Sequence, residues 1–232
     1  MEAVIQLSNV TKLYGKTVAL SNVNLNIYTG KIIGLLGPNG SGKTTLLKTI
    51  MKIIRQQNGY VSICGIPVSY ETRRFISYMP DREFLYDFMT VNDAINYYID
   101  MFTDFDVVRA GELCAKLGLD RNSLVERLSK GTKEKVALML TLSRKVPIYL
   151  LDEPLGSLDP VIKHEMLTVI KETKTPDCVI IISTHLIRDT EEILDEIILL
   201  KNGFIAGQLD VAQIRSENKD VEAVYLEVFT NV

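Results

Sequence analysis

The chain has 232 residues, of which 47% are hydrophobic and 24% are charged, and its formal net charge is −3. This length suffices for one large domain, or for a domain with an insert, that buries a sizeable core. The weakly acidic balance argues against a polyanion-binding surface, so we expect no nucleic-acid partner.

The cysteines and the apolar runs bear on the compartment. The three cysteines are scattered and lack C-x-x-C spacing: Cys64, Cys114 and Cys178. We therefore expect neither disulfides nor a zinc site, and a reducing compartment. The chain start lacks a signal-peptide pattern, and the longest apolar runs are far too short to span a bilayer. Any membrane-spanning part would thus belong to a partner.

Two β-rich stretches flank a glycine-rich loop near the start of the chain. Residues 4–28 predict strands, because residues 22–27 alternate asparagine with apolar side chains and the pair at 14–15 marks a turn. A further strand is predicted at 60–64, between two glycines. The chain therefore opens with an antiparallel sheet that is interrupted by a strand, a loop and a helix.

The interrupting loop fits G-x-x-x-x-G-K-[ST] without a gap. It lies between an apolar run, 32–36, and a helical pattern that reaches residue 54. That context separates a phosphate loop from a chance match. The loop residues are Gly37, Pro38, Asn39, Gly40, Ser41, Gly42, Lys43, Thr44 and Thr45. They predict a site for a nucleoside triphosphate.

The residue types of this loop suit a polyphosphate. Glycines let the backbone turn its N–H groups toward an anion, and a helix that begins near Lys43 adds the positive end of its dipole. The ammonium of Lys43 would reach the β and γ oxygens, and the hydroxyl of Thr44 would bind Mg²⁺. A plain turn between strand and helix would not need this Lys-Thr pair.

The middle of the chain changes to a helical pattern. A strand at 75–79 precedes it, Thr90 and Asp93 form a start signal, and further helices are predicted at 106–117 and 132–145. Pro147 then ends the last helix. We interpret residues 80–146 as a helical insert.

An alternation of strand and helix returns after this insert. Buried strands are predicted at 148–151 and 179–182, with a helix at 160–171 between them. The remaining predictions are a helix at 189–195, strands at 197–200 and 204–206, a weak helix at 211–216 and a possible strand at 223–229. The predicted fold is α/β, a P-loop NTPase with a RecA-like mixed sheet. Its core comprises 1–79 and 147–212 with an N-terminal antiparallel β subdomain, 80–146 is the helical subdomain, and 213–232 is a short tail.

Three polar side chains follow the predicted buried strands. Asp152 ends the first of them and is placed to hold Mg²⁺, while Glu153 would face the γ-phosphate as a general base. His185 follows the neighbouring strand and would lie at the same sheet edge, where ligands of open α/β sheets gather. A solvent-exposed strand end and a structural histidine are the simpler alternatives.

These motifs, in this order, resemble the nucleotide-binding subunit of an ATP-binding cassette (ABC) transporter over residues 4–210. Residues 128–132, Leu-Ser-Lys-Gly-Thr, resemble the LSGGQ signature of that family, and 156–159 resemble its interface loop. The resemblance implies that Tyr14 stacks on adenine and that His185 contacts the γ-phosphate. It also implies ATP and Mg²⁺ as cofactors and ATP hydrolysis as the activity.

The signature segment has two interpretations. Ser129 and Gly131 open the last helix of the insert, where a serine could be merely a helix cap. A hydroxyl, backbone N–H groups and the helix dipole also make an anion site. The resemblance implies a head-to-tail dimer, of identical or different ATPase subunits, in which this segment closes over the partner's γ-phosphate.

The sequence departs from the family pattern at two places. Asp81 stands where the family has glutamine, so we expect a metal ligand that alters Mg²⁺ affinity or slows turnover. The signature has Lys130 and Thr132 in place of glycine and glutamine, a style that resembles bacterial exporter-type drug and peptide ATPases. The apolar segment 82–89 follows Asp81, and the resemblance implies that a membrane subunit contacts 81–89.

The sequence as a whole thus predicts an ATPase subunit that is peripheral to the cytoplasmic side of the cell membrane and drives transport, with a lean toward export of a drug, peptide or lipid-like substrate. A soluble ABC ATPase acting on nucleic acid or the ribosome is the alternative. The repair type needs a long coiled-coil insert and the ribosomal type two cassettes, and this length holds neither. A phosphate-loop kinase or GTPase has no reason to carry residues 128–132.

Overall fold

The computed structural model describes residues 2–156 and 158–230. Its central sheet has six strands in the order β10-β9-β3-β8-β7-β6, parallel except for the β9-β10 hairpin. The strands are β3 (Lys31–Leu36), β6 (Ile76–Met79), β7 (Ile148–Asp152), β8 (Val179–Thr184), β9 (Glu196–Lys201) and β10 (Phe204–Asp210). A phosphate-loop strand thus lies at the centre of this sheet.

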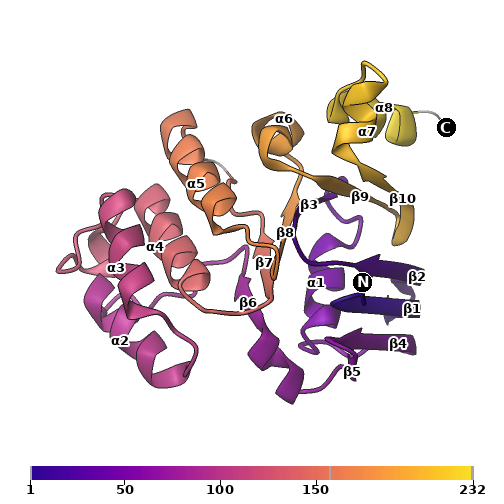
Figure 1. Cartoon of the computed structure of the whole chain (residues 1–232). Helices are drawn as coiled ribbons and strands as arrows, with labels where there is room; N and C mark the ends of the chain where they lie inside the picture. The colour runs from indigo at the N-terminus through magenta and orange to yellow at the C-terminus, as the bar shows by residue number, and fades with distance from the viewer. Residues whose placement is uncertain (1, 157, 231–232) are drawn as a thin grey trace.

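A second, antiparallel sheet stands beside the first (Figure 1). Its order is β2-β1-β4-β5, and its strands are β1 (Ile5–Tyr14), β2 (Thr17–Ile27), β4 (Asn58–Ile63) and β5 (Ile66–Pro67). Helix α1 (Lys43–Ile50) packs its buried face into the apolar cluster that both sheets share. This packing ties the helix after the phosphate loop to both sheets.

Buried strands explain the continuous apolar runs of the sequence. In β3, Ile32 and Leu36 face the cluster that the helices of the other side cover, while Ile33 and Leu35 face α1 and the antiparallel sheet. Both faces of β3 are therefore buried, and every residue after its first, Lys31, is apolar or glycine. The predicted buried strands of the central sheet are confirmed.

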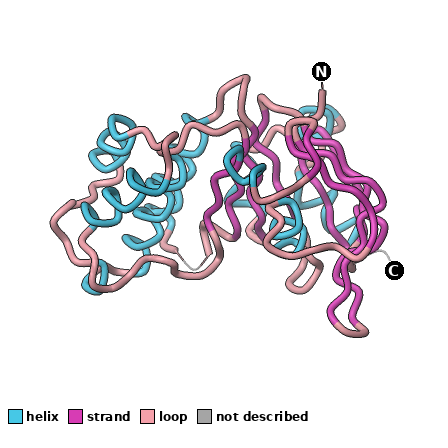
Figure 2. Tube along the Cα trace, turned by 90° about the horizontal axis from the view of Figure 1, so that it is seen from below, coloured by secondary structure: helices cyan, strands magenta, loops and turns pink. Residues whose placement is uncertain are grey.

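The remaining helices gather at one end of the central sheet and along one of its faces (Figures 1 and 2). The end carries α2 (Val91–Met101), α3 (Val107–Lys116) and α4 (Lys130–Leu142). The short 3₁₀ turn Glu71–Phe75 lies between β5 and β6, and the turn Val125–Arg127 lies between α3 and α4. Helix α5 (Pro160–Thr173) packs on α4, and α6 (Ile187–Thr190), the 3₁₀ turn Glu191–Ile193, α7 (Val211–Ser216) and α8 (Val221–Thr230) follow. No helix of the described ranges is at once long enough and apolar enough to cross a membrane.

The helix starts follow the sequence signals. Thr90 caps α2, its hydroxyl accepting from the Asp93 N–H at 3.0 Å while the Asp93 carboxylate accepts from the Thr90 N–H at 2.9 Å. This is the capping box that the sequence predicts. Asp106 likewise caps α3 through the N–H groups of Val108 and Arg109.

The strand predicted at 223–229 is wrong, because this segment is helix α8. Its apolar residues sit at helical spacing: Val221 and Val224 are buried, and Tyr225 and Val228 pack against the same cluster. The valines and aromatics favoured a strand by composition, but the spacing of three, four and seven residues is that of one helix face. Tertiary packing of that face decided the outcome.

Candidate nucleotide-binding site

The phosphate loop leaves its helix uncapped. Helix α1 begins at Lys43 with Gly42 at the N-cap, and no side chain of the cap accepts from the first N–H groups. Gly40 and Gly42 adopt φ of 80° and 110°, which L side chains rarely adopt. Gly37 is required for another reason, since a Cβ there would lie 2.4 Å from the carbonyl oxygen of Leu200. Free N–H groups at a helix start make an anion site.

Lys43 is held inside this loop. Its side chain is buried, and Nζ donates to the carbonyl oxygen of Gly37 at 2.8 Å and lies 3.5 Å from Oε1 of Glu153. The nearby hydroxyl of Ser41 is buried and has no hydrogen-bond partner among the described residues. A buried hydroxyl without an acceptor or donor costs free energy. The loop therefore presents a charge and an unsatisfied polar atom, which a phosphate oxygen would satisfy.

Asp152 ends β7 fully buried at the foot of the loop. Its Oδ1 accepts from the hydroxyls of Ser183 and Thr44, the latter at 3.2 Å, and its Oδ2 accepts from the Tyr78 hydroxyl at 3.3 Å. Burial raises the pKa of this carboxyl, while the Ser183 and Thr44 donors oppose the shift and the charge of Asp81 adds to it. An acid and a hydroxyl 3.2 Å apart beside free helix N–H groups suit Mg²⁺, which takes few protein ligands together with phosphate oxygens.

Glu153 turns the opposite way from Asp152. Its φ is 50°, a left-handed conformation that costs a non-glycine residue about 1–3 kcal/mol and is concentrated at functional sites. Its N–H donates to the Ser183 carbonyl at 3.0 Å, which holds the turn. The carboxylate then bridges Lys43 and the Nδ1 of His185, the latter at 2.9 Å. The strand end thus presents one carboxylate inward and one toward the loop.

A hollow of about 380 Å³ opens over these groups. Its lining includes loop residues from 39 to 45, Glu153, the exposed carboxylate of Asp81 and the ring of Tyr14. Tyr14 is 50% exposed, and Lys12 Nζ lies over its ring, 5.1 Å from the centroid. The size is that of a small-molecule site, and the aromatic rim lies at one end of a phosphate loop.

The signature residues lie apart from this hollow. Ser129 caps α4, and its Oγ accepts from the Thr132 N–H at 3.1 Å. Gly131 is buried, and a Cβ there would lie 2.5 Å from Cδ1 of Ile162, so this glycine also lets α4 pack closely on α5. Within one chain, Ser129 and Gly131 do not line the hollow. In the loop 156–159, Asp159 caps α5, whereas Ser157 lies outside the described residues.

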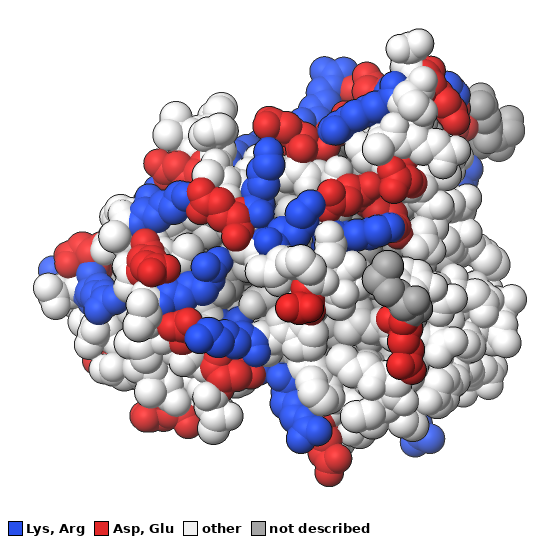
Figure 3. Space-filling model, viewed as in Figure 1, with Lys and Arg blue, Asp and Glu red and all other residues white. Residues whose placement is uncertain are grey.

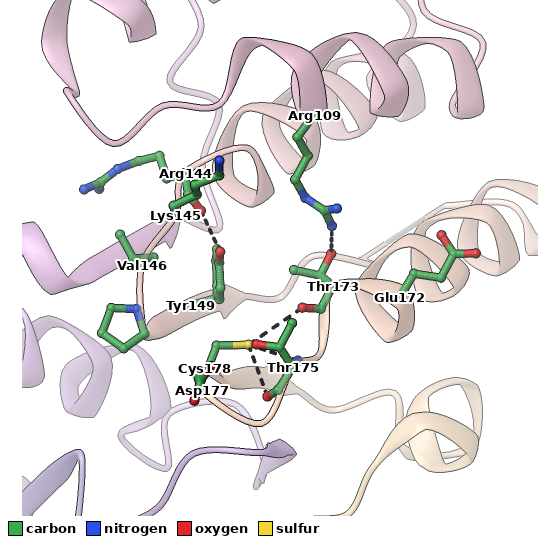
Figure 4. A pocket seen from close by; sticks show the side chains of 11 residues that line it. Arg109, Arg144, Lys145, Val146, Tyr149, Glu172, Thr173, Thr175, Asp177 and Cys178 are labelled. Atoms are coloured by element: carbon green, nitrogen blue, oxygen red, sulfur yellow. Dashed lines mark hydrogen bonds between the residues drawn. The ribbon is translucent and has the colours of Figure 1, made fainter.

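A larger hollow, of about 430 Å³, lies away from the phosphate loop, and its basic side chains already have partners (Figure 4). Arg109 donates to the Thr173 hydroxyl at 2.7 Å and to the Leu142 carbonyl. Arg144 donates to Asp104 and to the Ile76 carbonyl. Their hydrogen-bonding capacity is engaged within the fold, so the chemistry points to the smaller hollow.

Tyr78 is the site residue that the sequence analysis missed. The parallel register pairs Tyr78 with Leu150, which places its ring on the sheet face from which Asp152 projects two residues later. A polar ring in a strand that ends beside an acid was the available signal. The acid that the Tyr78 hydroxyl contacts depends on the order of the strands, which the sequence alone does not determine.

Fold and site together define a phosphate-loop NTPase of mixed-sheet type. The family model described as "ABC transporter" matches residues 20–156, more than half of the chain. The chain therefore belongs to the ABC transporter family. It is an ATP-binding subunit with ATPase activity, and ATP and Mg²⁺ are its cofactors.

Relatives and solved structures agree with this assignment. The chain is 29% identical to the ABC transporter ATP-binding protein YtrB of Bacillus subtilis, over 96% of this chain and 77% of YtrB. It is 31% identical to the uncharacterized ABC transporter ATP-binding protein MJ1023 of Methanocaldococcus jannaschii, over 88% of this chain and 76% of the relative. Among solved structures, an ATP-binding subunit of an ABC transporter superposes with a TM-score of 0.87 at 25% identity, covering 97% of this chain and 99% of that one. A dimeric post-hydrolysis structure of the ATP-binding cassette MJ0796 with ADP and Pi gives 0.78 at 27% identity, covering 89% of this chain and 98% of that one.

Proposed function

We propose that two ATPase subunits of this kind, identical or different, sandwich two ATP molecules head to tail. The observation that supports this most is the separation of the two half-sites. The phosphate loop has uncapped N–H groups in its own hollow, whereas the α4 start at Ser129 and Gly131 has no phosphate to contact within its chain. A second copy would bring the two together, and the MJ0796 cassette forms a dimer in its ADP and Pi state.

The geometry supports a role for each site residue. Residues 37–45 bind the phosphates and Tyr14 stacks on adenine, because Tyr14 and most residues of the loop from 39 to 45 line one hollow. Thr44 and Asp152 would hold Mg²⁺, which would neutralise charge on the phosphate oxygens, and Asp81 would add a carboxylate at the rim.

Hydrolysis requires a base and a group that orients it. Glu153 accepts the proton of the attacking water, and His185, 2.9 Å from its carboxylate, orients it and contacts the γ-phosphate. Lys43, which contacts Glu153 in this structure, moves its charge to the β and γ oxygens when nucleotide is present, since one ammonium cannot serve both fully. The Lys43-Glu153-His185 chain keeps these charges compensated until then.

Replacing Glu153 by glutamine tests both the base and the dimer. Glu153→Gln keeps the size of the side chain, so we expect ATP binding to persist, turnover to fall at least about a hundredfold, and an ATP-dependent dimer to accumulate on a sizing column. Glu172→Gln is the matched control, because Glu172 is exposed and pairs with Lys116 on the surface. Undiminished phosphate release by Glu153→Gln would remove it as the base. A variant that stays monomeric at saturating Mg-ATP would contradict the sandwich.

We further propose that segment 81–89 contacts a membrane subunit at the cytoplasmic face of the membrane. Tyr86 and Phe88 are 53% and 75% exposed and stack with ring centroids 5.5 Å apart. An exposed aromatic pair in the segment that follows Asp81, which itself lines the nucleotide hollow, suits a contact that senses the nucleotide. Phe88→Ser should lower co-purification with a multi-span subunit while leaving ATPase activity of the isolated chain unchanged.

The proposed direction is export, because the signature residues Lys130 and Thr132 resemble those of exporter-type ATPases and because Asp81 replaces the usual glutamine. The proposed cargo is a drug, a peptide or a lipid-like molecule. Uptake of labelled cargo into inverted vesicles that contain the chain and its membrane subunit supports export, and uptake into right-side-out vesicles contradicts it.

A soluble ABC ATPase that acts on nucleic acid or the ribosome is the second candidate. Acidic and basic side chains intermix on the face in Figure 3, with no continuous basic area among the described residues there for a polyanion. This pattern favours the transporter subunit. Recovery of the chain with ribosomes or DNA instead of a multi-span protein would reverse the choice.

A further inference from the structure

Tyr78 reaches the buried Asp152 carboxylate from the neighbouring strand. Its hydroxyl lies 3.3 Å from Oδ2, whereas the hydroxyls of Thr44 and Ser183 both donate to Oδ1. Among the described side chains, Tyr78 is thus the donor that serves Oδ2. A buried carboxylate whose second oxygen lacks a donor carries an uncompensated share of its charge.

The contact is built by the sheet and by burial. Parallel pairing of β6 with β7 sets Tyr78 beside Leu150, and Ile76 and Tyr78 pack into the same cluster as Ile148 and Leu150. The ring is therefore fixed along the strand. A tyrosine hydroxyl is protonated at neutral pH, so Tyr78 has a proton to donate to Oδ2.

We propose that Tyr78 is a positioning residue for Mg²⁺: its hydroxyl fixes the orientation of the Asp152 carboxylate and thereby sets the Mg²⁺ affinity of the nucleotide complex. The inference rests on the proposed metal role of Asp152. Side chains that hydrogen-bond metal-binding carboxylates orient them, and their loss weakens metal binding. Tyr78 also lies three residues before Asp81, so it connects the metal-binding carboxylate to the start of segment 81–89.

Tyr149 provides a matched control in the same sheet. It is buried on β7, and its hydroxyl donates to the Arg144 carbonyl at 2.6 Å, at the hollow of Figure 4. Tyr78→Phe and Tyr149→Phe each remove one hydroxyl and one hydrogen bond. A merely structural role predicts similar effects of both on stability and none on Mg²⁺ dependence.

The experiment titrates MgCl₂ into the full chain with a fixed, subsaturating amount of a fluorescent, non-hydrolysable ATP analogue, and follows binding by anisotropy. Binding in EDTA and thermal unfolding without nucleotide are measured on the same samples. For Tyr78→Phe we expect the half-saturating Mg²⁺ concentration to rise about tenfold, the lower end of the range for such partners because Oδ1 keeps its two donors. Tyr149→Phe should leave it unchanged, and binding in EDTA should be the same in all chains.

Asp152→Asn separates the failure of this inference from the failure of the metal role. If Asp152→Asn weakens the Mg²⁺ dependence and Tyr78→Phe titrates like Tyr149→Phe, Tyr78 has no positioning role and the inference is overturned. If Asp152→Asn also titrates like the unmodified chain, the metal role of Asp152 fails and the inference fails with it.

Discussion

Two glycines of the phosphate loop should differ sharply in their tolerance of a methyl group. Gly42 has φ of 110°, and a Cβ there would lie 2.5 Å from the Ala19 carbonyl oxygen, a backbone atom of β2. Gly40 has φ of 80°, but its Cβ would meet no described atom within 4 Å. Gly42→Ala therefore adds a backbone collision to a strained conformation, while Gly40→Ala adds conformational strain alone.

The structure gives a magnitude to each change. A left-handed conformation costs a non-glycine residue about 1–2 kcal/mol, which is the whole expected effect of Gly40→Ala. The overlap at Gly42 adds about 1–3 kcal/mol, as overpacked sites do, and φ lies further from the favoured left-handed region. We expect losses of about 1 kcal/mol for Gly40→Ala and about 4 kcal/mol for Gly42→Ala.

Thermal unfolding in EDTA without nucleotide measures this difference. For a chain of this size, 1 kcal/mol corresponds to about 2–4 °C, so the midpoint should fall by about 3 °C for Gly40→Ala and about 12 °C for Gly42→Ala. Omitting nucleotide keeps the test on the fold itself. Equal shifts in the two variants would refute the steric account of Gly42 and with it the close approach of the loop to β2.

Three further changes probe the site. Ser129→Asp keeps an N-cap for α4, so the stability of the fold should be preserved, but its added charge would face the phosphate of the proposed partner. A sizing column at saturating Mg-ATP should therefore show loss of the dimer. A dimer of normal affinity would mean that Ser129 is only a helix cap. Asp152→Asn should raise the unfolding midpoint at pH 7, because burial raises the pKa of Asp152 in the folded chain. The contribution of Asp152 to the free energy of unfolding is then complete below the unfolded pKa of 3.8 and is lost as pH rises through the folded pKa. The advantage of the variant should therefore shrink on acidification, and a pH-independent difference would contradict this origin. Asp81→Gln removes a carboxylate that lines the hollow and should raise ATP turnover severalfold in a phosphate-release assay, because less negative charge then faces the nucleotide. A variant that turns over no faster would contradict a slowing effect of Asp81.

The sequence predicted the parts of the site that are continuous in the chain. The strand, loop and helix over 32–50 follow from an apolar run, three glycines and a helical pattern, all local features. The capping box of Thr90 and Asp93 is equally local, and it formed as predicted. Local signals fail where packing decides, as at 223–229, where strand-forming residues follow helical spacing on α8.

Only the tertiary structure decided which distant side chains meet. Glu153 and His185 are in contact because β7 and β8 are parallel neighbours, and Tyr78 reaches Asp152 because β6 lies on the other side of β7. Strand order depends on how whole elements pack, and the hydrophobic periodicity of the sequence does not determine it. Motifs and periodicity therefore determined the kind of protein and its phosphate loop, whereas the non-local pairing of strands determined the hydrogen bonds that orient its acids.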